Sequence, residues 1–460
     1  MGSIARQESD GIRAKIFLSN TCRLTLLLRA AHLPGYPDRM KYLDFLNTDY
    51  EPEESELICE FLVETDGTME FDVAAGAVAA ESSVGTWTEL TTMRSYVEKL
   101  HATVFDIDGS RIKVAYPVDL FEPGNMANIM SSVCGNVFGL KGLKTLKLDD
   151  IHYPKVLAES FMGPKFGIDG VREILKIPKR PFVGTIIKPK LGLVTEDHAE
   201  VAYESWAGGC DVVKDDENLS SQSFNVFEKR MEATLKARDK AERETGEKKV
   251  YLINVSAETN EMIRRTKMVA DNGGEYVMVD IITCGNSAIQ TLREEDLGVA
   301  IHAHRAGHGA FTLDPKHGVS MKVIAKNTRL MGADQLHVGT AVGKMKEGKE
   351  EVLDNIDCLT SKMHGIKTAM PVASGGLYPA VVPPLLAIFG YNVIVQAGGG
   401  VHGHPDGTYA GATAMRQAID AVMKDQTLEE YSETHDELKK AIETWPAPPS
   451  SLNCDVCTIK

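Results

Sequence analysis

A regular alternation of short apolar runs with amphipathic stretches occupies the chain from Phe182 onward. We predict strands at 182–187, 210–213, 250–255, 276–281, 300–303, 335–338, 371–373 and 393–396. Helical periodicity lies between them, for example at 226–244, 259–272, 320–331 and 410–423. Eight strand–helix units over about 240 residues predict a (β/α)8 TIM barrel. The alternative is a doubly wound open sheet, which seldom contains eight regular units.

The part of the chain before this alternation has a different pattern. Residues 57–63 and 111–116 are expected to form strands, and 71–80 and 126–138 to form helices. Two helices on a small sheet are typical of an α+β domain. We therefore predict an α+β N-terminal domain over residues 40–160, a TIM-barrel catalytic domain over 161–440 and a C-terminal tail over 441–460.

The two ends of the chain differ from both domains. The apolar stretch 25–28 is too short for a secretory signal, and Pro37 interrupts the chain before Met40. We expect Met40 to be the natural start, and residues 1–39 to be a disordered or wrongly assigned extension. In the tail, Cys454 and Cys457 form a lone C-x-x-C pair. Because a zinc site needs about four ligands, this pair is not expected to bind metal.

Composition excludes several classes of partner. The net charge of −15 argues against nucleic acid, so an anionic substrate needs a local basic pocket. The eight cysteines are scattered, which is typical of a reducing, cytoplasmic environment. No apolar run approaches the ~20 residues of a membrane span.

Polar and glycine residues follow nearly every predicted barrel strand. In chain order they are Lys188 and Lys190, then Lys214, Asp216 and Glu217, then His304 and Arg305, then His337, then Ser374, Gly375 and Gly376, and finally Gly398 and Gly399. Active-site groups of TIM barrels collect at the carboxyl ends of the strands. We therefore expect these residues to surround one site at the mouth of the barrel.

The segment after the second strand predicts a metal site. Side chains alternate along a strand, so Lys214 and Asp216 should share a face, and Glu217 can join them where the strand ends. Oxygen ligands suit a hard divalent cation, of which Mg²⁺ is the default. Lys214 fits such a site only as a counter-ion, or after a modification that reverses its charge. The alternative is a solvated acidic strand end with a lysine salt bridge.

The later strand ends predict binding of phosphate. Glycines let backbone N–H groups approach an oxyanion closely, which favours a phosphate site at Gly375–Gly376 and Gly398–Gly399. The alternative is that these glycines only form tight turns into helices. Arg305 with His337 could clamp a second phosphate, so the substrate is expected to carry two.

Lysines supply further candidate groups at the same mouth. Lys188 and Lys190 should point to one side of their strand, and a lysine crowded by other cations can act as an acid or base. Lys344 follows Gly339 in a glycine-bounded segment, which is typical of a closing lid.

Long ordered segments resemble ribulose-1,5-bisphosphate carboxylase/oxygenase (RuBisCO) large chains. The similar segments are 81–88 and 135–139 in the first domain, and 185–193, 209–218, 302–306, 337–344, 374–376 and 398–400 in the barrel. The resemblance covers about residues 40–423, and the amino-acid sequences of the segments 217–220 and 335–337 are most like those of the archaeal-type form III.

The resemblance implies a role for each matching residue. Lys214 would take up an activating CO₂ as a carbamate and, with Asp216 and Glu217, hold Mg²⁺. Lys188 would handle the proton at C2 of ribulose 1,5-bisphosphate, and His304 would assist hydration and proton transfer. Lys190 would support the site, Lys344 would close over the new carboxylate, and Arg305 and His337 would bind one phosphate. The other end of the substrate would contact Thr86, Trp87, Ser374, Gly375, Gly376, Gly398 and Gly399.

The resemblance also implies an assembly and a pathway. Glu81 and Asn136 would come from a neighbouring subunit, so the catalytic unit would be a homodimer or a higher assembly of dimers, without a small subunit. The implied reaction is Mg²⁺-dependent addition of CO₂, or O₂, with cleavage to 3-phosphoglycerate, which is a carboxy-lyase activity. Form III resemblance suggests salvage of ribose from nucleotides such as AMP.

Two alternatives and one departure stay open. A RuBisCO-like enolase or isomerase would act on a related sugar phosphate, and a catalytically silent paralogue would have lost metal ligands. The presence of Lys188, Lys214, His304, Lys344 and Asn136 favours the carboxylase over both. The stretch 344–374 is shorter than we expect for the family, which could alter lid closure and the choice between CO₂ and O₂.

Overall fold

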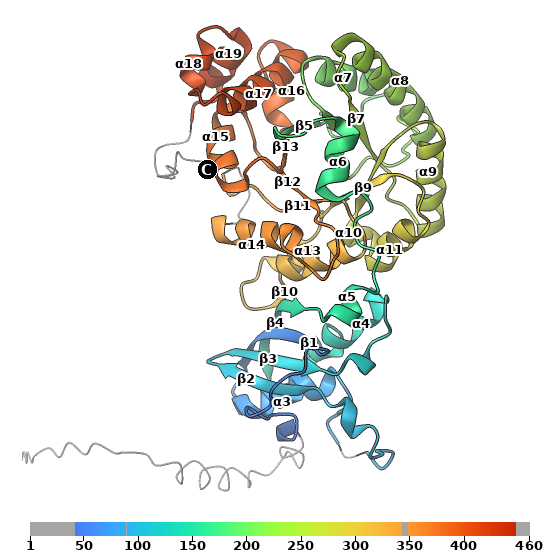
Figure 1. Cartoon of the computed structure of the whole chain (residues 1–460), viewed down its shortest axis with the longest axis vertical. Helices are drawn as coiled ribbons and strands as arrows, with labels where there is room; N and C mark the ends of the chain where they lie inside the picture. The colour runs from blue at the N-terminus through green and yellow to red at the C-terminus, as the bar shows by residue number, and fades with distance from the viewer. Residues whose placement is uncertain (1–41, 89, 343–347, 448–460) are drawn as a thin grey trace, which may run out of the picture.

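The computed structural model describes residues 42–88, 90–342 and 348–447. They form a barrel and a smaller α/β unit packed against one side of it (Figure 1). The expectations for residues 1–39, for Lys344 and for the Cys454–Cys457 pair lie outside these residues.

The barrel is closed by eight parallel strands in the order β11-β12-β13-β5-β6-β7-β8-β9. The strands are β5 (Phe182–Ile186), β6 (Val212–Lys214), β7 (Val250–Asn254), β8 (Tyr276–Asp280), β9 (Ala300–His304), β11 (Gln335–His337), β12 (Met370–Ser374) and β13 (Ile394–Gln396). Each is buried on both faces, which explains why the runs are apolar along nearly their whole length. The predicted TIM barrel is confirmed, and the open sheet is wrong.

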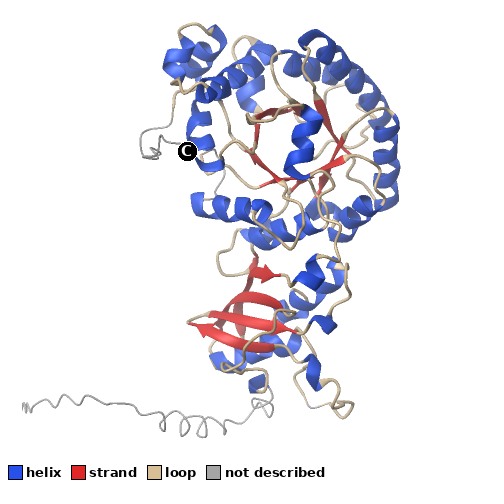
Figure 2. Cartoon of the chain, viewed as in Figure 1, coloured by secondary structure: helices blue, strands red, loops and turns tan. Residues whose placement is uncertain are grey.

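Helices cover the outside of the barrel (Figure 2). They are α7 (Thr195–Ala207), α8 (Phe227–Thr245), α9 (Thr259–Asp271), α10 (Ile281–Cys284), α11 (Asn286–Glu294), α12 (Gly309–Thr312), α13 (Met321–Leu330), α14 (Lys349–Thr360), η4 (Pro379–Val381), α15 (Val382–Phe389), α16 (Gly399–His402), α17 (Gly407–Met423), α18 (Leu428–Ser432) and α19 (Asp436–Thr444). The four helices expected from periodicity are confirmed with small shifts at their ends. α19 crosses residue 440, where we expected the tail to begin.

One helix closes the amino end of the barrel. α6 (Gly167–Leu175) buries Ile168, Val171 and Leu175 against the lowest layer of interior side chains, which includes Phe182 and Val212. This apolar plug leaves only the opposite, carboxyl end open for chemistry.

The smaller unit is a five-stranded sheet in the order β10-β4-β1-β3-β2. Its elements are β1 (Leu57–Thr65), α3 (Phe71–Glu81), η1 (Glu98–Leu100), β2 (Thr103–Asp108), β3 (Arg111–Tyr116), η2 (Val118–Leu120), α4 (Met126–Val133), η3 (Asn136–Gly139), β4 (Leu143–His152) and α5 (Lys155–Ala158). The helix predicted over 126–138 is wrong beyond Val133. Gly135 leaves helical geometry at ψ −128°, and a β-carbon there would lie 2.0 Å from the Ser131 carbonyl oxygen.

The barrel half of the chain supplies the fifth strand of that sheet. β10 (Gly318–Val319), from the segment between β9 and α13, pairs in parallel with β4. Next to it, the Tyr153 hydroxyl donates to Asn327 Oδ1 at 2.6 Å, and Lys326 pairs with Asp150. The two units are therefore joined through the segment that follows β9.

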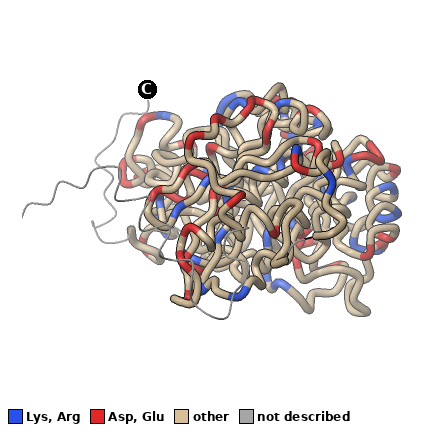
Figure 3. Tube along the Cα trace, turned by 90° about the horizontal axis from the view of Figure 1, so that it is seen from below, with Lys and Arg blue, Asp and Glu red and all other residues tan. Residues whose placement is uncertain are grey.

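The distribution of charged residues and the hydropathy of the helices are consistent with the expectations drawn from composition. Lys and Arg are interspersed with Asp and Glu along the chain trace (Figure 3). In the part of the chain that the structure describes, no helix combines the length and apolar character needed to cross a membrane.

Candidate active site

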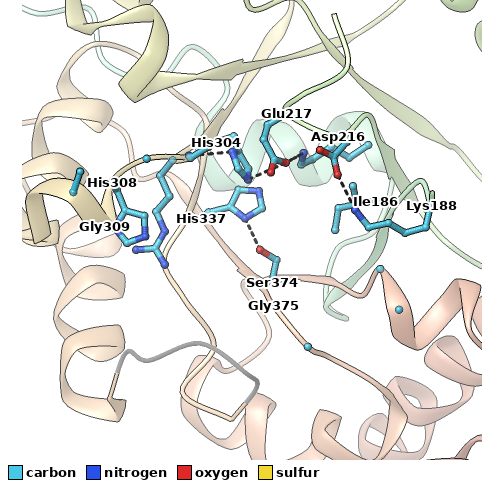
Figure 4. A pocket seen from close by; sticks show the side chains of 18 of the residues that line it. Ile186, Lys188, Asp216, Glu217, His304, His308, Gly309, His337, Ser374 and Gly375 are labelled. Carbon is cyan, nitrogen blue, oxygen red and sulfur yellow. Dashed lines mark hydrogen bonds and ion pairs between the residues drawn. The ribbon is translucent and has the colours of Figure 1, made fainter. Parts of the chain in front are cut away.

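The carboxyl ends of the barrel strands surround a cavity of about 730 Å³. Most of the predicted site residues line it: Lys188, Lys214, Asp216, Glu217, His304, Arg305, His337, Ser374, Gly375, Gly376, Gly398 and Gly399. Figure 4 shows Lys188 facing Asp216 on one side, and His304 beside Glu217 on the other. Residues from six different strand ends therefore meet at one place, as the barrel geometry requires.

Lys190 does not lie where strand alternation placed it. β5 ends at Ile186, and Lys190 lies beyond Pro189, exposed and outside the cavity lining. Proline has no N–H to donate to a neighbouring strand, so the strand does not continue to Lys190. The prediction that Lys188 and Lys190 project together from one strand into the mouth is wrong.

Four predicted residues lie on the smaller unit and do not reach the cavity of their own chain. Glu81 ends α3 and accepts a hydrogen bond from the Tyr42 hydroxyl at 2.9 Å. Thr86 and Trp87 follow α3, and the Trp87 side chain is 68% exposed. Asn136 begins η3 and is exposed. The single chain therefore does not bring these four groups to the barrel mouth.

Lys214 lies at the end of β6 and is completely buried. Its Nζ donates to the Asp215 carbonyl at 2.7 Å and lies 3.7 Å from Glu217 Oε2. Burial lowers the pKa of Lys214, while the neighbouring carboxylates oppose that shift. The net direction favours the neutral amine, which is the nucleophilic form of lysine.

Asp216 and Lys188 form the wall opposite His304. Lys188 Nζ donates to Asp216 Oδ2 at 2.7 Å. Burial raises the pKa of Asp216, but the hydrogen bond and the charge of Lys188 outweigh it, and the net pKa is lowered. Asp216 is therefore an anion that faces the cavity, as a metal ligand must be.

Asp215 points away from the cavity, as alternation along the strand requires. Its buried carboxylate accepts hydrogen bonds from Arg230 Nε at 3.2 Å and the Asn254 amide at 3.0 Å, and also bonds His198 and Tyr251. The Asn254 side chain in turn donates to the carbonyls of Glu217 and Leu219. This network, hidden behind the cavity, holds the end of β6 in place.

His304 is oriented by an aspartate that the sequence analysis missed. His304 Nδ1 lies 3.2 Å from Asp280 Oδ1, and its Nε2 lies 3.5 Å from Glu217 Oε2. Burial and the nearby Lys214 lower the pKa of His304. Asp280 was overlooked because we extended its strand to Ile281, which hid the acid inside the apolar run. His308, four residues after His304, also lines the cavity.

The glycines that follow β12 and β13 at the edge of the cavity differ in the space available for an added side chain. Gly375 and Gly376 have φ of 121° and 74°, which disfavours other residues. A β-carbon on Gly400 would lie 2.2 Å from the Leu377 carbonyl oxygen, whereas one on Gly399 would meet no atom within 4 Å. Gly400 therefore allows α16 to pack on the loop after β12, and Gly399 leaves space open to the cavity.

This difference predicts opposite outcomes for two alanine variants. Gly400→Ala should destabilise the protein by about 1–3 kcal/mol or more, because the backbone must move apart. Gly399→Ala should leave stability nearly unchanged but weaken anion binding at the phosphate site predicted from the sequence, because a methyl group would occupy the approach to the backbone N–H groups. Chemical denaturation and the KM of each variant test this pair. Equal stability of the two variants would contradict the packing argument.

In the described residues, no three His, Cys, Asp or Glu side chains are grouped as ligands of a metal ion. Asp216 and Glu217 provide two carboxylates, and Lys214 lines the same cavity with its Nζ 3.7 Å from Glu217 Oε2. A third oxygen donor would arise only if the Lys214 amine were carboxylated. The donor set then fits a hard divalent cation.

Comparisons with known proteins agree with this geometry. The family model for the ribulose bisphosphate carboxylase large chain, catalytic domain, matches residues 167–445, and that for its N-terminal domain matches residues 44–157. Ribulose bisphosphate carboxylase of Methanosarcina mazei is 49% identical over 422 residues, which cover 87% of this chain and 99% of that protein. The protein of the same name from Pyrococcus abyssi is 49% identical over 410 residues, and the match covers 88% of this chain and 96% of that protein.

Solved structures show the same fold. The octameric RuBisCO of Pyrococcus horikoshii OT3, in complex with sulfate ion, superimposes with a TM-score of 0.85 at 48% identity, covering 88% of this chain and 96% of that one. The dimeric archaeal RuBisCO of Hyperthermus butylicus gives a TM-score of 0.82 at 45% identity, with 88% and 99% covered.

Proposed function

Because the chain belongs to the ribulose bisphosphate carboxylase large-chain family, we propose that it carboxylates ribulose 1,5-bisphosphate. CO₂ and water would be added, and the carbon chain cleaved to two molecules of 3-phosphoglycerate, with O₂ as a competing substrate. The observation that carries the proposal is the place of Lys214. It is completely buried beside Asp216 and Glu217, and faces the same cavity as Lys188 and His304.

The proposal assigns the metal site to modified Lys214, Asp216 and Glu217. The buried neutral amine of Lys214 would add an activating CO₂ and release one proton, so that the side chain becomes an anionic oxygen donor. This removes the conflict between a lysine and a cation at one site. Mg²⁺, when bound, would supply positive charge that stabilises the charge developing on substrate oxygens.

The other residues would position the substrate and move its protons. The Lys214 carbamate or a neighbouring group would take the proton from C3, and Lys188 would handle the proton at C2. His304, kept neutral and held by Asp280, would assist hydration and proton transfer. Lys344 would close over the site, and Lys190 would support it from outside the cavity. Gly375, Gly376, Gly398 and Gly399 would bind one phosphate, and Arg305 the other.

The assignment of His337 to a phosphate has less support than that of Arg305. Burial lowers the pKa of His337 well below its usual value, so its ring is neutral near pH 7. Its Nε2 lies 2.8 Å from His302 Nε2, and its Nδ1 lies 2.6 Å from Ser374 Oγ. With a neutral ring and both nitrogens engaged, His337 would bring no positive charge to the phosphate, so Arg305 would supply it.

The proposed catalytic unit is a homodimer or an assembly of dimers, without a small subunit. Glu81, Thr86, Trp87 and Asn136 would reach the cavity of a second copy, because they do not reach their own. The solved dimeric and octameric relatives support this arrangement. We place the enzyme in the cytoplasm, in salvage of ribose from nucleotides such as AMP. The absence of ribulose bisphosphate formation from AMP in the native extract would contradict that pathway.

One assay tests the reaction. Protein preincubated with CO₂ and Mg²⁺ receives ribulose 1,5-bisphosphate and labelled bicarbonate without oxygen. We expect acid-stable label in 3-phosphoglycerate that depends on Mg²⁺. Consumption of substrate without label would instead indicate the enolase or isomerase, and no consumption by folded protein would indicate the silent paralogue.

A further inference from the structure

A chain of three hydrogen bonds runs from the barrel interior to the cavity. Parallel pairing of β9 with β11 places His302 opposite Gln335. His302 Nδ1 lies 2.8 Å from Gln335 Oε1, and its Nε2 lies 2.8 Å from His337 Nε2. The chain ends at the cavity, where His337 Nδ1 lies 2.6 Å from Ser374 Oγ. Figure 4 shows this last contact.

The two inner members do not reach the substrate cavity. His302 and Gln335 are completely buried, whereas His337 and Ser374 line the cavity. The mechanism proposed above uses neither inner residue. Any effect that they have on the reaction must therefore pass through His337 and Ser374.

The chain can have only one direction at a time. A neutral imidazole has one donor and one acceptor nitrogen. If one nitrogen of a ring donates a hydrogen bond, the other nitrogen of that ring must therefore accept one, and the reverse also holds. Both rings are neutral, because burial lowers the pKa of His302 and of His337 well below the usual value. The group at the inner end therefore decides the direction of the whole chain.

At the inner end that group is an acceptor. The Gln335 carbonyl oxygen faces His302 Nδ1, so this nitrogen carries the hydrogen and His302 Nε2 accepts. His337 must then donate from Nε2 and accept at Nδ1, and the Ser374 hydroxyl donates to Nδ1. With its hydrogen committed inward, the Ser374 oxygen faces the cavity as an acceptor.

We propose that Gln335 and His302 are positioning residues that fix the tautomer of His337 and, through it, the direction of the Ser374 hydroxyl. The effect on catalysis rests on the proposed function, whereas the tautomers can be measured without any reaction. An apolar residue at 335 would leave His302 Nδ1–H without an acceptor, and the chain would lose its fixed direction.

The direct test is the protonation pattern of the two rings. Long-range ¹H–¹⁵N correlation of histidine-labelled, substrate-free protein distinguishes a protonated Nδ1 from a protonated Nε2. We expect His337 protonated at Nε2 and His302 at Nδ1, with signals assigned through His302→Gln and His337→Gln. A wild-type His337 protonated at Nδ1 would overturn the proposal.

Two variants of Gln335 then test whether this residue determines the tautomer of His337. Gln335→Met removes the acceptor with similar volume, and should give His337 signals of mixed or reversed tautomer. Gln335→Glu keeps an oxygen facing His302 and should restore the wild-type pattern. In the carboxylase assay, Gln335→Met should raise the KM about 2- to 10-fold, the range of one hydrogen bond, with a smaller change in kcat.

The outcomes separate the two proposals. An unchanged His337 tautomer in Gln335→Met, or a Glu variant that behaves like Met, would overturn the positioning roles. If the tautomers follow Gln335 but the wild-type protein forms no labelled 3-phosphoglycerate, the proposed reaction fails and the hydrogen-bond chain stands.

Discussion

Lys214→Ala is expected to reduce carboxylase turnover at least about 10³-fold while leaving the protein folded. A bound metal stabilises developing charge by several kcal/mol, and each 1.36 kcal/mol is a factor of ten in rate. Without the Lys214 amine there is no carbamate, and Asp216 and Glu217 alone would make a weak site. Apolar truncation of a buried lysine also removes an unfavourable desolvation, so we expect little loss of stability.

Steady-state carboxylation and thermal unfolding of the same preparation test this prediction. A second readout is uptake of ¹³CO₂ as a carbamate signal in the presence of Mg²⁺, which should disappear in the variant. Lys249→Ala is the matched control, because Lys249 is also completely buried but pairs with Glu247 outside the cavity. Full turnover in Lys214→Ala would refute the carbamate–metal site.

Asp215→Ala is expected to destabilise the protein by about 3–5 kcal/mol, the loss measured when one partner of a buried ion pair is removed. Arg230 and Asp215 are both completely buried, 3.2 Å apart, so truncation leaves the guanidinium without its counter-charge. The Asn254 amide and the Tyr251 hydroxyl lose an acceptor at the same time. Turnover should also fall, because this network holds the end of β6.

Urea denaturation at a fixed protein concentration measures the effect, since oligomerisation makes apparent stability depend on concentration. Asp106→Ala is the control. Its ion pair with Lys113 is 3.2 Å long but roughly half exposed, and such pairs contribute about 0–1 kcal/mol. A loss of less than about 1 kcal/mol for Asp215→Ala would show that Arg230 finds another partner or water.

The barrel, and the grouping of Lys214, Asp216 and Glu217 at its mouth, followed from local patterns. Strands that are buried on both faces consist almost entirely of apolar residues. These apolar runs end where a polar side chain points into the cavity. Around Lys214 the alternation of faces sufficed to separate Asp216, which lines the cavity, from Asp215, which does not. Strand ends are harder, because they depend on neighbouring strands. For this reason Lys190 was placed in the mouth wrongly, and Asp280 was hidden inside its strand.

Local patterns were enough to predict which residue types stand at the carboxyl end of each strand, because strand period and chain order are local properties. Which of those residues touch depends on how the strands pair in the folded barrel. The pairing of β9 with β11 sets Gln335 beside His302, and the pairing of β11 with β12 brings His337 to Ser374. The tertiary structure also places Glu81 and Asn136 away from the cavity of their own chain. Contacts between residues far apart in sequence depend on the register and closure of the barrel, which no local pattern encodes.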